Sequence, residues 1–193
     1  MSILMVLLTL AISVWNSYAV GSALPYARSQ GGMFKLVTVA GGVMTGIGFT
    51  MVMAVIIMGV GGSMHMIPPH VMHAFSKIMP ALIIIPLVLA GSIITIQSWR
   101  AVFVSGQSGL ERAGNIAGAA WNTYAMAENA MSLPGILKGA FSSDGDDEDS
   151  RGYALMIAIM ALLSGFAIAY FMIEFFARRE VRKMSGQMGF SRG

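Results

Sequence analysis

The chain has 193 residues, of which 56% are hydrophobic and only 11% are charged. A soluble domain of ordinary composition carries about 25% charged residues, so these few charges exclude a soluble globule covered by polar side chains. The chain contains no cysteine, which excludes disulfide and thiolate chemistry. The apolar residues form long unbroken blocks, a pattern typical of membrane-spanning helices.

Four apolar blocks predict an all-α membrane protein, with about four transmembrane helices at residues 3–23, 36–61, 78–103 and 153–177. Each block reaches the roughly 20 residues that are needed to cross about 30 Å of hydrocarbon. We expect the first block to remain in the protein, because no Lys or Arg precedes Arg28 and the basic start of a signal peptide is therefore missing. The lipid bilayer is the first predicted partner.

The charges are distributed unevenly along the chain. Basic residues gather in the C-terminal tail, at Arg178, Arg179, Arg182, Lys183 and Arg192. Under the positive-inside rule this cluster predicts a cytoplasmic C-terminus. Four crossings then place both termini in the cytoplasm and the acidic loop at 142–151 outside, although Arg28 and Lys35 in the first loop oppose this orientation. The charge pattern indicates membrane topology, and we predict no nucleic-acid partner.

Residues 104–133 are predicted to extend the third helix beyond the membrane, because no proline interrupts residues 87–133. A heptad pattern indicates one seam along this extension. We expect the seam to pack on another subunit, on the protein itself or on the membrane surface. Its residues are Phe103, Leu110, Ala113, Ala117, Ala120, Tyr124, Ala127 and Met131.

Small residues recur at four-residue spacing in two of the predicted spans. They are Gly42 and Gly46 in the second span, and Ala161, Gly165 and Ala169 in the fourth. Small side chains let membrane helices approach closely and gain van der Waals contact. These residues predict helix packing, either within one chain or between subunits.

The loop after the second span carries the only metal-like pattern, with Met66 near His65, His70 and His73. Imidazole and thioether ligands suit copper, particularly Cu(I), so copper handling is one alternative function. The other interpretation is a set of partly exposed histidines at the membrane interface, and our main prediction includes no cofactor.

Sequence motifs of known catalytic sites are absent, including GxSxG, HExxH and the P-loop, so we predict that the chain is not an enzyme. A holin-like or other pore is a second alternative. Polar residues in the spans that could line a path are Thr45, Thr50, Ser92, Thr95 and Gln97.

Residues 14–21, Gly48-Phe49 and residues 121–124 resemble segments of uncharacterised small membrane proteins of phages and other mobile elements. This resemblance implies a component of a virion or of a secretion or conjugation system, and it assigns no functional residue. We therefore predict a non-enzymatic membrane component that assembles with itself or with partner membrane proteins.

Overall fold

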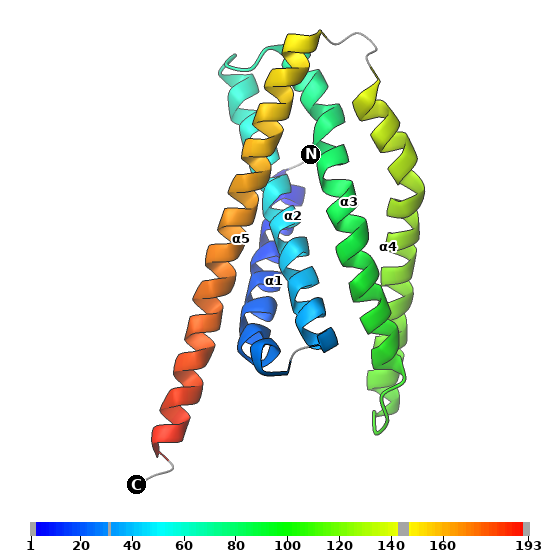
Figure 1. The fold of residues 1–193 in the computed structure, drawn as a ribbon, viewed down its shortest axis with the longest axis vertical. Coiled ribbons are helices and arrows are strands. Elements are labelled where there is room, and N and C mark those ends of the chain that lie inside the picture. The colour runs from blue at the N-terminus through cyan, green and yellow to red at the C-terminus, as the bar shows by residue number, and fades with distance from the viewer. Residues whose placement is uncertain (1–2, 31, 143–146, 191–193) are drawn as a thin grey trace. The chain divides into compact units, whose positions relative to one another are not determined.

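The computed structural model describes residues 3–30, 32–142 and 147–190, and all regular structure within these ranges is helical. The helices in chain order are α1 (Ile3–Gln30), α2 (Gly32–Ser63), α3 (Pro69–Val102), α4 (Gly109–Phe141) and α5 (Glu148–Phe190) (Figure 1). Four of these helices, all but α4, are long and apolar enough to cross a membrane. The prediction of an all-α membrane protein with about four spans is confirmed.

The chain forms two compact units. The first contains residues 1–60 and 160–193, and therefore α1, most of α2 and most of α5. The second contains residues 61–159, which comprise the end of α2, all of α3 and α4, and the first turns of α5. Helices α2 and α5 each contribute to both units.

Close contacts of small residues hold α2 against α5 in the first unit. A Cβ atom added at Gly46 would lie 2.7 Å from the ring of Phe166, and one added at Gly165 would overlap with the backbone of Thr50. The hydroxyl of Thr50 donates a hydrogen bond to the carbonyl of Leu162 at 3.4 Å. A larger residue would therefore displace the Phe166 ring at position 46 and the α2 backbone at position 165, so glycine lets the two helices approach.

The other predicted packing residues also lie within this unit. Ala161 and Ala169 of α5 are buried, and a Cβ built at Gly42 would lie 3.8 Å from Cδ1 of Ile173. The sequence left open whether these small residues pack within one chain or between subunits. The structure shows contacts within one chain.

The prediction that the third helix continues through residues 104–133 is wrong. Helix α3 ends at Val102, and Gly106 adopts a left-handed conformation with φ of 83°. Ser108 and Glu111 then form a capping box that starts α4, with each side chain bonded to the other residue's backbone amide. Helix α4 also runs past Pro134 to Phe141 instead of ending at the proline.

Gly165→Ala tests the close contact between α2 and α5. We expect a loss of about 1–3 kcal/mol in stability, because the new methyl group meets the backbone nitrogen and Cα of Thr50 as well as its hydroxyl, and the backbone cannot simply turn away. Thermal unfolding in detergent or in bilayers measures the change.

Gly152→Ala is the matched control for Gly165→Ala, because it lies on the same helix and a Cβ there meets nothing within 4 Å. We expect this control to be neutral or slightly stabilising. Equal stability of the two variants would show that the α2–α5 contact is not close.

Candidate functional site

A polar seam joins α3 to α4, which lie side by side in the second unit (Figure 1). The Nδ2 atom of Asn122 donates to the hydroxyl of Ser98 at 2.8 Å, and the hydroxyl of Thr95 donates to the Asn122 carbonyl at 3.4 Å. At the next residue of each helix, the indole of Trp99 donates to the hydroxyl of Thr123 at 2.9 Å. Side chains in the apolar helix α3 therefore find partners on α4.

The residues of α4 on this side form what we call the inner seam. All are buried or half-buried, and they recur at alternating spacings of four and three residues: Asn115, Ala119, Asn122, Met126, Asn129, Leu133, Ile136 and Ala140. The Met126 side chain lies directly against Gly91 of α3, where a Cβ atom would overlap with its sulfur. The inner seam is therefore a second heptad pattern, and it binds α4 along α3.

The predicted seam lies on the opposite face of α4. All eight of its residues are exposed, with Leu110 86% and Met131 76% accessible. We call the seven that belong to α4, from Leu110 to Met131, the outer seam. From Ala113 to Met131, each outer-seam position lies two residues from an inner-seam position, which is about 200° around a helix with 3.6 residues per turn. The described residues therefore leave this seam uncovered, and it does not pack on them.

The histidine loop does not form a metal centre of histidine and carboxylate ligands. Across residues 3–30, 32–142 and 147–190, no group of three or more His, Asp or Glu side chains is placed to hold a metal ion. His65 lies in the loop with φ of 56°, whereas His70 and His73 belong to the first turns of α3. Met66 is exposed beside this loop. Cu(I) binding with methionine ligands stays a prediction.

The first turns of α5 lie beside the first turns of α3. Residues at the start of each helix line one pocket of about 290 Å³. They include Pro68 and His70 at the start of α3, and Asp147 and Tyr153 at the start of α5. The guanidinium of Arg151 also donates to the carbonyl of Ala140, near the end of α4, at 2.8 Å. The start of α5 therefore lies next to the start of α3 and the end of α4.

Part of the predicted acidic loop at 142–151 is helical, because α5 begins at Glu148. Asp144 and Asp146 lie outside the described residues. Hydrogen bonds from Ser150, and to a smaller extent the charge of His70, lower the pKa of Asp147. Asp147 therefore caps α5 as a carboxylate, and any stabilisation it gives is lost as the pH falls through that lowered pKa.

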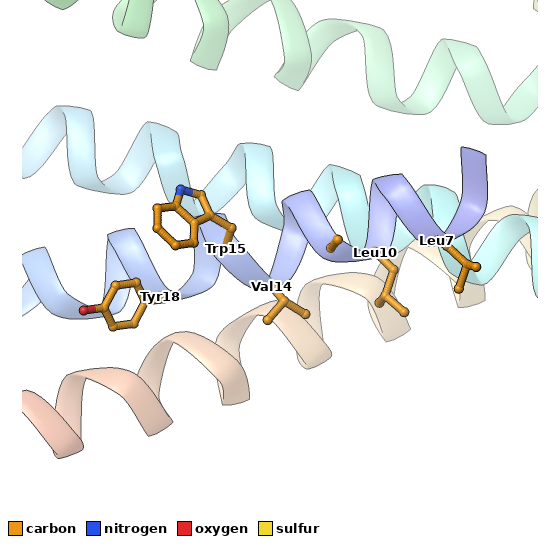
Figure 2. Close-up of a pocket in the computed structure, with 6 residues that line it drawn as sticks. Leu7, Leu10, Val14, Trp15 and Tyr18 are labelled. Atoms are coloured by element: carbon orange, nitrogen blue, oxygen red, sulfur yellow. The ribbon is translucent and has the colours of Figure 1, made fainter. Parts of the chain in front are cut away.

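A wide apolar groove of about 630 Å³ lies on α1. Figure 2 shows the side chains of Leu7, Leu10, Val14, Trp15 and Tyr18 along it, all from this one helix. Trp15 is 68% accessible and stacks obliquely near Tyr18, with ring centroids 5.9 Å apart. Such an open apolar face suits lipid chains better than a polar ligand.

The residues proposed as pore lining are mostly used in packing. Thr45 and Thr50 are fully buried in the first unit, and Thr95 bonds to the backbone of both α3 and α4. Only Ser92 among the five is exposed, and Gln97 is half-buried. These five residues therefore do not form a continuous polar path of the kind that a pore needs.

The chain matches no protein-family model, no curated protein and no solved structure. The candidate site therefore depends on geometry alone.

Sequence reasoning missed the inner seam, although a signal was present. Asn115, Asn122 and Asn129 recur every seven residues, and such a repeat indicates one polar stripe on a helix. The prediction was based on the apolar and small residues of the outer seam, which lie on the opposite face of α4.

A double-mutant cycle with Asn122→Ala and Ser98→Ala tests the inner seam. We expect a coupling free energy of about 0.6 kcal/mol and at most about 1.7 kcal/mol, the average and the maximum measured for hydrogen bonds between membrane helices. Stability measurements on the wild type, both single variants and the double variant give this value.

Asn129→Ala with Ser98→Ala is the control pair, because the Asn129 amide bonds to the carbonyl of Ala125 on its own helix. We expect no coupling between them. A coupling of zero for Asn122 and Ser98 would mean that the two helices are not paired in this register.

Proposed function

We propose that the protein is a non-enzymatic membrane component that assembles with itself through the outer seam of α4. The observation that carries this proposal is the exposure of a complete seven-residue heptad seam on a helix whose opposite face is already bound to α3.

The composition of the outer seam suits a second helix. Four of its seven residues are alanines, and three of these, at 113, 120 and 127, recur every seven residues. Of the other four positions, three carry the larger residues Leu110, Tyr124 and Met131, and the fourth is Ala117. Small residues at one heptad position allow close approach, while the larger ones fill the space beside them. A second copy of the same seam offers the matching surface, as closed symmetric assemblies require.

The C-terminal basic cluster supports a cytoplasmic C-terminus, with the acidic loop outside. If only the four apolar helices cross, the N-terminus is cytoplasmic as well. The resemblance to membrane proteins of mobile elements supports a virion, or a secretion or conjugation apparatus, as the setting of the assembly. In that setting the partners are further copies of the chain or other membrane proteins.

Ala120→Phe tests the proposed assembly, because it places a bulky ring at the middle of the outer seam. We expect the dissociation constant of the oligomer to rise at least about tenfold, equivalent to 1.4 kcal/mol. Sedimentation or native mass spectrometry of the protein in detergent or nanodiscs measures the oligomer.

Ser132→Phe is the matched control for Ala120→Phe. It adds the same ring to another exposed position of α4 that lies outside both seams. We expect it to leave the oligomer intact. A wild-type protein that is strictly monomeric, or equal weakening by both substitutions, would rule out the outer seam as the assembly surface.

A further inference from the structure

We propose that α4 crosses the bilayer as a fifth membrane helix, so that the N-terminus and the C-terminus lie on opposite sides. This inference requires only the membrane class of the protein and the geometry of the second unit. It does not depend on the proposed self-assembly.

Helix α3 is an apolar span of 34 residues, so its two ends lie on opposite sides of the membrane. The start of α5 lies beside the start of α3, where residues of both helices line one pocket. The chain leaves α3 at Val102 on one side and must begin α5 on the other. Only α4 connects these two points, so α4 must bring the chain back across.

Helix α4 has the length and the partners for this crossing. Its 33 residues extend about 50 Å at 1.5 Å per residue, against a hydrocarbon core of about 30 Å. Glu128 is the only charged residue between Arg112 and Lys138. The Asn122 amide and the Thr123 hydroxyl bond to side chains of α3. Helix α4 can therefore enter the bilayer paired with α3, although its sequence is less apolar than that of a solitary span.

The distribution of the basic residues along the chain also favours the fifth crossing. With four crossings and a cytoplasmic C-terminus, six of the 12 Lys and Arg residues lie inside and six outside. With five crossings, Arg28, Lys35, Arg100 and Arg112 join the five C-terminal residues, giving nine inside. Only Lys77, Lys138 and Arg151 then lie outside. The positive-inside rule therefore favours five crossings. The opposition of Arg28 and Lys35 to the four-span orientation also disappears.

The fifth crossing gives Glu128 a particular environment. This carboxylate is exposed on α4, next to Ala127 of the outer seam. A carboxylate at membrane depth is costly against lipid, and such residues generally face another protein chain or water. The crossing therefore places a polar group beside the surface that we propose for assembly.

Single-cysteine labelling tests the crossing, since the chain has no cysteine of its own. The four variants are Met66→Cys, Ser105→Cys, Glu148→Cys and Ser185→Cys, all at exposed positions. A membrane-impermeant maleimide is applied to intact cells that express the full chain, and then again after permeabilisation. We expect Met66→Cys and Glu148→Cys to react in intact cells. Ser105→Cys and Ser185→Cys should react only after permeabilisation.

Four crossings give a different pattern, in which Ser105→Cys shares a side with Glu148→Cys and Met66→Cys shares a side with Ser185→Cys. Reaction of positions 105 and 148 from the same side would overturn the proposal. Val104→Cys and Asp149→Cys provide a second pair at exposed neighbouring positions, so that poor insertion of one variant does not decide the result. Oligomer measurements do not enter this test, and its outcome is separate from that for the outer seam.

Discussion

Polar side chains in a membrane protein need hydrogen-bond partners, because hydrocarbon supplies none. In this chain Thr95, Ser98 and Trp99, near the end of the apolar helix α3, meet this need through Asn122 and Thr123 of α4. Their mutual bonds fix the register of the two helices. Because Asn122 faces α3, the outer seam must face away from it.

The orientation of α4 has two consequences. A helix that is bound along one heptad seam leaves the opposite seam free for another molecule, which is the basis of the proposed assembly. The same pairing places α4 alongside the apolar span α3, which is the basis of the proposed fifth crossing. The two consequences are separate, because an assembly seam can act inside or outside the bilayer, and a crossing helix need not assemble.

Much of the fold could be predicted from the sequence. The four apolar blocks identified the spans, since hydropathy directly reflects transfer into lipid. The break between α3 and α4 was missed because the prediction gave weight to the absence of proline. The local signals were the left-handed Gly106 and the capping pair Ser108 and Glu111. The residues of the outer seam share one exposed face of α4, and their assembly role stays a prediction. Which face of α4 is exposed depends on the turn at 103–108. That turn sets which face of α4 meets α3, and the one signal for this face within α4 was the seven-residue repeat of Asn115, Asn122 and Asn129.

Disulfide cross-linking between α3 and α4 in native membranes tests the central claim, the pairing of these helices through the inner seam, most directly. Gly91→Cys combined with Met126→Cys places two thiols where these residues meet, and it leaves the bonds of Asn122 unchanged. Gly91→Cys combined with Met131→Cys, on the outer seam, is the control. The pairing predicts a rapid cross-link within one chain for the first pair and none for the second. Absence of the first cross-link, or equal yields from both pairs, would contradict it.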